Sequence, residues 1–194
     1  MTATEKNFPL HEIETAPEAA RPILEGAKKG FGMVPNLHKV LAEAPAALEG
    51  YATLWGIFEK SSFTPAERQV VYLTSNYENE CCYCMAGHSV LAKGAGVPAD
   101  AIEAIRDGKP IADAKLEALR AFTSKIVVNR GWVAEDEVAA FLAAGYTRQQ
   151  VLEVILGVAV KVISNYTNHV AETPLDGFMK DTVWTPPAKR ERAA

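Results

Sequence analysis

The sequence has few cysteines and no long apolar run, and both scarcities limit what the chain can be. It holds three cysteines in 194 residues, at positions 81, 82 and 84. Cysteines this close together cannot join distant segments, so a disulfide framework like that of small secreted domains is excluded. The longest apolar run, 158–163, is interrupted by Lys161. It falls far short of the roughly 20 residues that a membrane helix needs, so we expect no membrane partner.

Positive charge is also scarce. Lys and Arg number 20 against 24 Asp and Glu, which gives a net charge of -4 at pH 7. Since no basic stripe is present, we expect no nucleic-acid partner. The first residues lack the apolar core of a signal peptide, and we therefore expect a cytoplasmic protein. The chain is 48% hydrophobic and 23% charged, which is ordinary for a globular domain.

What the chain does contain is helical periodicity. No stretch alternates for long in the manner of a strand, whereas apolar residues recur at helical spacing, so we predict an all-α protein. Trp55 and Trp132 are expected in the core. The predicted helices cover residues 16–30, 37–42, 46–60, 64–77, 81–93, 98–108, 115–129, 135–144 and 147–165, with helix resuming through 169. We expect a loose segment over 1–15, one domain over 16–180, and a loose charged tail over 181–194.

Two helix starts resemble each other. Phe63–Glu67 and Tyr146–Gln150 each combine an aromatic residue with a capping box, and each precedes a helix rich in Val and Leu. In this register Cys81 falls opposite Ser164 and Cys84 falls opposite Thr167. The pattern predicts a helical bundle of two related halves, of which one carries thiols.

The cysteines form a pattern with chemical meaning. Cys81 and Cys84 are spaced Cys-x-x-Cys, and His88 follows four residues later. On a helix these three positions share a face, so two thiols able to form a disulfide would lie beside a base. A free thiol titrates near ~8.5. The helix N-terminus favours the thiolate at Cys81, whereas His88 favours it at Cys84, and the residues alone do not choose between the two.

Five further residues are candidates for a proton relay. Glu67 is more simply explained as a helix cap. Gln69 can turn toward the thiols but cannot carry a proton as a carboxylate does. Glu80 is more simply explained as a solvated acid at a helix start. Tyr83 could line the approach to the thiols. His169 is either a structural histidine or part of the wall of the thiol pocket.

A metal site is an alternative use of the same residues. Cys81, Cys84 and His88 could hold zinc if His38 or His169 supplied the fourth ligand. No second ligand pair has the spacing of a zinc site, so we expect neither a metal nor another cofactor.

Other side chains suggest assembly. Cys82 would point away from the other two thiols, as a packed small residue that could lie at a subunit contact. Trp184 is expected to pack on a partner subunit. The apolar stripes on short helices exceed what one chain can bury, so we expect a homo-oligomer, at least a dimer.

Several motifs together resemble one known family. They are residues 64–68, the Cys-x-x-Cys-x-x-x-His run at 81–88 and the segment 92–97, with the turn 32–36 and the segment 145–169 as weaker support. Over about residues 20–180 the chain resembles the carboxymuconolactone decarboxylase/alkylhydroperoxidase AhpD-like family, in its peroxidase-related branch.

The resemblance implies an all-helical oligomer, a dimer, trimer or hexamer, which reduces hydroperoxides without a cofactor. It implies that Cys84 attacks the peroxide, Cys81 resolves the intermediate and His88 accepts the proton, with an external dithiol as reductant. The chain departs from the family pattern at Gln69, where a glutamate is usual, and at Tyr83, where a histidine is frequent. Both departures would weaken the relay.

We therefore predict a thiol-dependent peroxidase with an antioxidant role. The alternatives are a general thiol–disulfide oxidoreductase, a non-redox lyase or decarboxylase of the carboxymuconolactone type, and a metal-binding helical module.

Overall fold

The structure is a computed structural model that describes residues 8–190. Within this range the chain is helical and contains no strand, which confirms the predicted all-α class. The helices are η1 (Glu18–Ala20), α1 (Arg21–Phe31), α2 (Asn36–Leu41), α3 (Pro45–Phe58), α4 (Pro65–Glu78), α5 (Cys82–Gly94), α6 (Ala99–Arg106), α7 (Ala114–Val128), α8 (Glu135–Ala143), α9 (Arg148–Ala171), η2 (Gly177–Thr182) and α10 (Pro187–Arg190).

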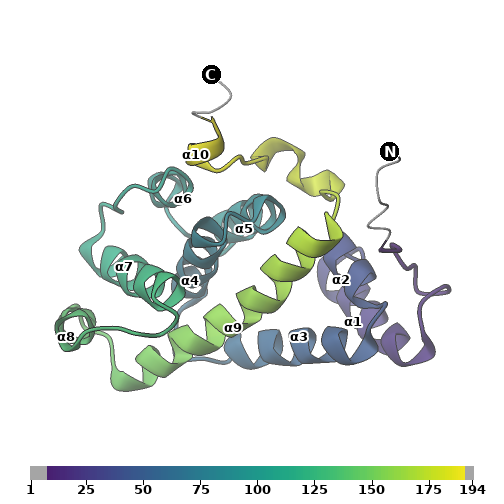
Figure 1. Ribbon diagram of the computed structural model, residues 1–194, viewed down its shortest axis with the longest axis horizontal. Coiled ribbons are helices and arrows are strands. Elements are labelled where there is room, and N and C mark those ends of the chain that lie inside the picture. Colours follow the sequence, from purple (N-terminus) through teal and green to yellow (C-terminus); the bar gives the residue numbers. More distant parts are fainter. Residues whose placement is uncertain (1–7, 191–194) are drawn as a thin grey trace.

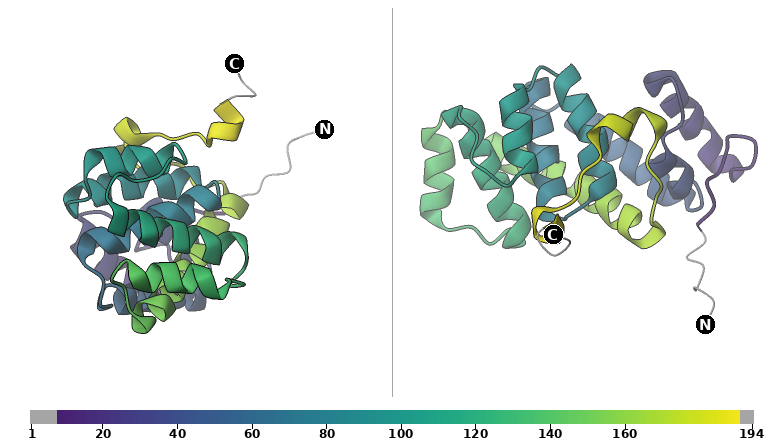
Figure 2. Two further views of the ribbon diagram at one scale, coloured as in Figure 1. Left: turned by 90° about the vertical axis from the view of Figure 1, so that its left-hand side faces the viewer. Right: turned by 90° about the horizontal axis from the view of Figure 1, so that it is seen from above.

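Helix α4 lies at the centre of the fold. It packs against α5, α6, α7 and α9, and its four consecutive residues 70–73 are fully buried. A helix buried on all sides must be apolar all round, as this stretch is. The long α9 crosses the molecule, with α7 and α8 near its start and α2 and α3 along its later part (Figure 1). Viewed from above, α1 and α8 lie at opposite ends of an elongated body (Figure 2).

The packing of α9 on its neighbours depends on a glycine. A Cβ atom placed on Gly157 would lie 2.7 Å from Phe58 of α3 and 2.8 Å from Val71 of α4. Real Cβ atoms do not approach side-chain carbons this closely, so only glycine lets the three helices meet here. This contact fixes α9 against α4, and α9 carries much of the site described below.

Both predicted capping boxes are present. The Thr64 hydroxyl accepts the Glu67 N–H (3.2 Å) and the Glu67 carboxylate accepts the Thr64 N–H (2.9 Å). Thr147 and Gln150 make the same pair of bonds at the start of α9 (3.2 and 2.9 Å). The two segments then differ. The first breaks after α4, whereas α9 continues to Ala171 without the interruption predicted after residue 165.

The break between α4 and α5 is a left-handed helix end. Glu80 has a positive φ of 51°, and the Cys81 N–H donates to the Asn76 carbonyl at 2.9 Å. This is the hydrogen bond that closes a Schellman motif. Cys81 is thereby the last residue of this motif and also the N-cap of α5, so the break places a thiol at a helix start.

The C-terminal segment differs from the expected loose tail. Trp184 is 3% exposed, its indole N–H donates to the Arg106 carbonyl at 2.8 Å, and its ring lies 6.0 Å from that of Tyr77. The expectation that this side chain packs on a partner subunit is therefore wrong, because its own chain buries it. The remaining parts of the two expected loose ends, 1–7 and 191–194, lie outside the described residues.

The expectation for Trp132 is also wrong, since its side chain is 84% exposed. Arg130 and Gly131 both have positive φ values, 55° and 85°, at the end of α7. This left-handed turn ends the helix and directs the following residue away from the core.

By length and composition α9 could cross a membrane, a test that core helices of soluble proteins also pass. In this fold it packs against α2, α3, α4, α5 and α7. It also bears buried polar side chains, Lys161, Asn165 and Asn168. These are features of an internal helix.

Candidate active site

The three residues of the predicted redox motif all lie at or near the start of α5 and all are buried. Cys84 and His88 are one turn apart within the helix. The sequence predicted Cys81 in the first turn of the helix. In the structure it is the N-cap, with extended backbone angles (φ -84°, ψ 98°). Its side chain is therefore free to leave the face that Cys84 and His88 share.

Cys84 sits where an anion is stabilised. The side-chain amide of Asn168 donates to its sulfur at 3.2 Å, and the charged Lys161 lies close by. Burial alone would raise the pKa of this thiol. The hydrogen bond from Cys81 and the charge of Lys161 outweigh burial and lower the pKa of Cys84 to about 5. These groups favour the thiolate form of Cys84.

Cys81 has the opposite character. Its hydrogen bond to Cys84, together with burial, raises the pKa of the Cys81 thiol far above its ordinary range. Its S–H also faces the backbone carbonyl of Asn165, at 4.0 Å. The Cys81 thiol thus donates a hydrogen bond to the Cys84 thiolate. The sequence alone did not decide which of the two sulfurs is the thiolate, and this arrangement favours Cys84.

A buried chain of three polar side chains supports the thiolate. Lys161, 1% exposed, donates from Nζ to His88 Nε2 at 2.9 Å. Nδ1 of His88 lies 2.8 Å from Oε1 of Gln69. Because Nε2 accepts from an ammonium group, Nδ1 must carry the proton and donate to Gln69. Gln69 therefore does turn toward the site, where it fixes the tautomer of His88.

This geometry changes the role expected for His88. Burial and the charge of Lys161 hold the pKa of His88 well below its usual value. Both ring nitrogens are engaged in hydrogen bonds. His88 is therefore poorly suited to take the Cys84 proton, and instead it positions Lys161.

Aromatic rings enclose the polar chain. Trp55 stacks on Tyr72 at 5.0 Å between centroids, and Tyr72 lies 4.8 Å from the His88 ring. Lys161 Nζ stands 5.3 Å from the centroid of Tyr72. A cation over an aromatic face is stabilised, and here the ring supplements the charge of the thiolate.

Tyr83 is held in place by hydrogen bonds. Its hydroxyl donates to the buried carboxylate of Asp176 and accepts the N–H of Leu37 at 3.2 Å. Asp176 also accepts the N–H of Asn36, at 3.1 Å. Burial, with the Asp176 bond, raises the pKa of Tyr83 far above its ordinary range. Tyr83 thus ties α5 to the start of α2 and to the segment before η2.

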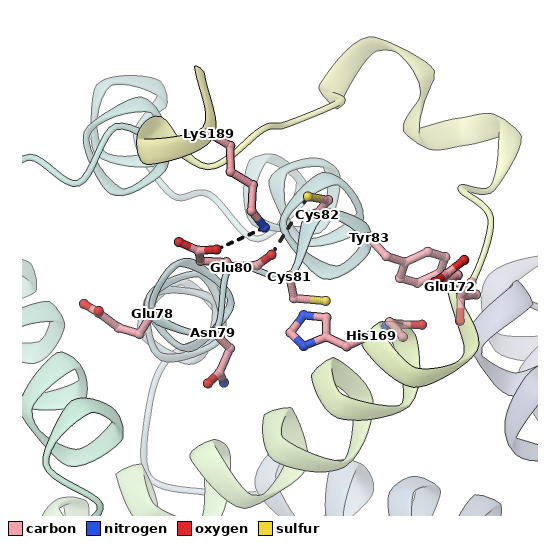
Figure 3. A pocket seen from close by; sticks show the side chains of 11 residues that line it. Glu78, Asn79, Glu80, Cys81, Cys82, Tyr83, His169, Glu172 and Lys189 are labelled. Atoms are coloured by element: carbon pink, nitrogen blue, oxygen red, sulfur yellow. Dashed lines mark hydrogen bonds and ion pairs between the residues drawn. The ribbon is translucent and has the colours of Figure 1, made fainter. Parts of the chain in front are cut away.

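The other relay candidates lie in three places. Glu67 is in the capping box and pairs with Lys115 (3.5 Å), so the cap interpretation holds. Glu80 is exposed and pairs with Lys189 at 3.1 Å. His169 is exposed and lines a pocket together with Cys81 (Figure 3).

The two thiols face different cavities. Cys81 opens to an outer pocket of about 600 Å³, whose wall includes several charged side chains (Figure 3). Cys84 instead lines an inner cavity of about 60 Å³, with Tyr51, Trp55 and His88 in its wall. The outer pocket is lined by Glu78, Asn79, Glu80, Cys81, Cys82, Tyr83, Asn168, His169, Glu172, Thr173 and Lys189. Tyr83 lines both spaces, so it separates them.

The sequence predicted that Cys82 is packed. In the structure it is exposed at the rim of the outer pocket. Partial burial holds the pKa of its thiol above the ordinary value. Across residues 8–190, no group of three or more His, Cys, Asp and Glu side chains is placed to hold a metal ion. The zinc site considered from the sequence does not assemble there.

Sequence reasoning missed the contribution of α9. Lys161, Asn165 and Asn168 reach the thiols from a helix some eighty residues further along the chain. A signal was present, because Lys161 is a single charge within the apolar run 158–163. A buried lysine in such a run requires a partner, and the partner is His88.

One protein-family model matches the segment that carries the thiols. Residues 43–124, from the end of α2 through most of α7, match the model of the carboxymuconolactone decarboxylase family. Over these residues the chain is similar to that family. The matched segment includes both thiols and His88, which confirms the resemblance inferred from the motifs. No curated protein sequence matches the chain.

Solved structures show the AhpD-type fold over about nine tenths of the chain. An uncharacterised peroxidase-related protein from Ralstonia eutropha JMP134, described as an alkylhydroperoxidase AhpD core, superposes with a TM-score of 0.79 at 18% identity, covering 89% of this chain and 93% of that one. The debrominase Bmp8, solved with 2,3,4-tribromopyrrole, gives 0.74 at 15% identity and covers 90% and 94%. A peroxidase-related protein from Silicibacter sp. TM1040 gives 0.70 at 16% and covers 91% and 94%.

Proposed function

We propose that the protein is a dithiol peroxidase, in which Cys84 attacks a hydroperoxide and Cys81 resolves the product. The observation that carries the proposal is the thiolate at Cys84, held by Lys161 and Asn168 beside a thiol at hydrogen-bond distance. A lowered thiol pKa in a water-poor cavity is what peroxide attack requires.

The reaction has two oxidative steps. The Cys84 thiolate attacks the terminal oxygen of ROOH, the O–O bond breaks, and Cys84 becomes a sulfenic acid. The alkoxide that leaves takes a proton from Lys161, whose charge acts on the Cys84 sulfur, and departs as ROH. Cys81 then attacks the sulfenic sulfur, its proton leaves with the hydroxyl as water, and a disulfide forms.

Reduction completes the cycle. An external dithiol attacks the disulfide at Cys81, the sulfur that faces the outer pocket. Cys84 then leaves as the thiolate that Lys161 and Asn168 already stabilise, because a thiol of low pKa is the better leaving group. The second thiol of the reductant releases Cys81 and becomes part of the oxidised reductant. The proton of the attacking thiol returns to Lys161, the proton of the second thiol goes to Cys81, and the initial state is restored.

A thiol titration tests the proposal. The reduced protein is treated with one equivalent of cumene hydroperoxide or hydrogen peroxide, and its free thiols are counted. We expect a loss of two thiols and formation of a Cys81–Cys84 disulfide, identified by mass spectrometry. Cys81→Ser should stop at a Cys84 sulfenic acid that dimedone traps, and Cys84→Ser should not react.

Cys82→Ser is the matched control, since this thiol takes no part in the steps above. It should behave as the wild type does. Loss of two thiols in Cys84→Ser would show that the roles are wrong, and a wild type inert to both peroxides would exclude the peroxidase.

A second candidate follows from the aromatic wall of the inner cavity and from the structural likeness to a debrominase. A dithiol can reduce a carbon–bromine bond. The Cys84 sulfur bonds to bromine, the carbon keeps the electron pair and takes a proton, and Cys81 displaces bromide as the disulfide closes. Release of one bromide per disulfide from a brominated pyrrole, with no thiol loss to peroxide, would favour this reaction.

A further inference from the structure

The inner cavity beside Cys84 adjoins a second space. A groove of about 310 Å³ lies between α1 and α3, on the side of the molecule away from α8. It is lined by Ile23, Gly26, Ala27, Phe31, His38, Tyr51, Ala52 and Trp55. Four of these side chains, Phe31, His38, Tyr51 and Trp55, also line the inner cavity. The groove and the cavity therefore share a wall.

The shared wall is a row of rings in contact. Successive centroids are 5.8 Å apart from Phe31 to His38, 5.5 Å from His38 to Tyr51, and 6.1 Å from Tyr51 to Trp55. His38 and Tyr51 are buried, whereas Phe31 is 44% exposed. Phe31 is also the last residue of α1, followed by Gly32 with a φ of 75°. Phe31 is therefore the ring of this row with the fewest packing constraints.

The sizes of the two spaces suit different parts of one molecule. An apolar cavity that admits benzene measures about 150 Å³. The inner cavity, at about 60 Å³, holds a peroxide group but no ring or alkyl tail beside it. The groove, at about 310 Å³, holds such a tail, and apart from His38 and Tyr51 its named wall is apolar or glycine.

A buried polar atom marks the passage between them. His38 is 8% exposed, and its Nδ1 has no hydrogen-bond partner. Buried polar atoms in proteins are nearly always paired, so this nitrogen calls for a ligand. The His38 side chain lies in the wall common to the groove and the cavity, beside the path that an entering hydroperoxide would take.

We infer that the α1–α3 groove is the substrate entrance and holds the apolar tail of an organic hydroperoxide, while the peroxide group passes the ring row to Cys84. The inference rests on the proposed function for its chemistry. It separates the two halves of the cycle in space, because the reductant would reach Cys81 from the outer pocket.

Filling the groove tests the inference. A Cβ atom on Gly26 meets nothing within 4 Å, so Gly26→Leu folds and places its side chain in the groove. Gly30→Leu is the matched control, an exposed glycine of the same helix with equally free space that does not line the groove. Leucine favours a helix over glycine at both positions.

The first measurement is the rate of thiol oxidation in the reduced protein. Gly26→Leu should lower the rate with cumene hydroperoxide about tenfold or more and leave the rate with hydrogen peroxide within about twofold. Gly30→Leu should change neither rate.

A second measurement does not depend on peroxidase activity. Alkylation of Cys84 by an N-phenyl iodoacetamide, followed by mass spectrometry, should slow in Gly26→Leu but not in Gly30→Leu, relative to plain iodoacetamide. If the wild type does not react with peroxide, the proposed function fails, and this alkylation ratio still decides whether the groove leads to Cys84.

Two results would overturn the inference. One is equal rates in Gly26→Leu and the wild type for both peroxides and both alkylating reagents, which would mean that Cys84 is reached by another route. The other is unchanged rates with an altered oligomeric state in size-exclusion chromatography, which would make the groove a contact between copies of the chain.

Discussion

Lys161 of α9 donates a hydrogen bond to His88 of α5 across the interior of the protein, at 2.9 Å. The pair supplies a fixed positive charge beside Cys84 without placing a charged histidine there. A buried ammonium needs compensation, and it obtains this from the imidazole nitrogen, the face of Tyr72 and the thiolate. The departure from the family pattern at Gln69 is consistent with this arrangement, since a neutral amide suffices to hold a neutral imidazole.

Replacing Lys161 by methionine tests the source of the thiolate. Methionine has similar length and no charge, so the pKa of Cys84 should rise from about 5 toward or above its ordinary ~8.5. At pH 7 the thiolate would fall from nearly all molecules to a few per cent, and iodoacetamide should react with Cys84 at least tenfold more slowly. The pH dependence of that rate gives the pKa directly.

Lys93→Met is the control for this experiment, because Lys93 is an exposed residue of the same α5. It should leave the pKa of Cys84 at the wild-type value. A Lys161→Met protein whose Cys84 still titrates near 5 would assign the stabilisation to Asn168 and Cys81 instead.

The sequence predicted the helices well and the site in part. Patterns that are local in the chain, such as the capping boxes at Thr64 and Thr147, determine where helices begin and were confirmed. The grouping of Cys81, Cys84 and His88 was also predicted, because these residues lie within about two turns of one helix. The pairing of His88 with Lys161 joins residues 73 positions apart, and only the packing of α9 on α4 and α5 brings them together.

Glu67 and Gln69 give a test of the relay. Glu67→Gln keeps the capping box, since glutamine serves the same role at residue 150, and it removes the ability to carry a proton together with the ion pair to Lys115. Oxidation of the thiols by peroxide should stay within about twofold of the wild type.

Gln69→Leu is expected to behave differently. It leaves the Nδ1–H of His88 unpaired in the interior, which costs on the order of 1–3 kcal/mol of stability, and it frees the ring that positions Lys161. Oxidation should slow, and the pKa of Cys84 should rise. If Glu67→Gln were the slower variant, the relay would run through Glu67 after all.

The stability of the fold should depend on pH through His38. Burial lowers the pKa of His38 to about 4 from an unfolded value near 6.5. Between these values the unfolded chain binds a proton that the folded chain does not, so stability falls as pH decreases. From pH 7.5 to pH 5 the loss is about 2 kcal/mol from this residue.

His38→Phe should remove that loss, because phenylalanine fits an aromatic row and cannot titrate. The comparison is between urea unfolding of both proteins at pH 7.5 and at pH 5, in the reduced state. The difference between the two proteins should grow by about 2 kcal/mol at the lower pH. An identical pH dependence in both would mean that His38 titrates alike in the folded and unfolded states.

His169 lines the outer pocket together with Cys81, which suggests a role in the reduction of the disulfide (Figure 3). An imidazole at this opening can act as a general base and take the proton of an incoming thiol. His169→Gln should therefore slow reduction of the Cys81–Cys84 disulfide by dithiothreitol several-fold at pH 7, and the deficit should shrink at pH 9, where the reductant is itself a thiolate. Oxidation by peroxide should not change, since it occurs at Cys84 in the other cavity.

His11→Gln, at a histidine that pairs with Glu43, serves as control and should leave both half-reactions unchanged. Equal slowing of oxidation and reduction in His169→Gln would argue instead that the residue holds the structure around both thiols.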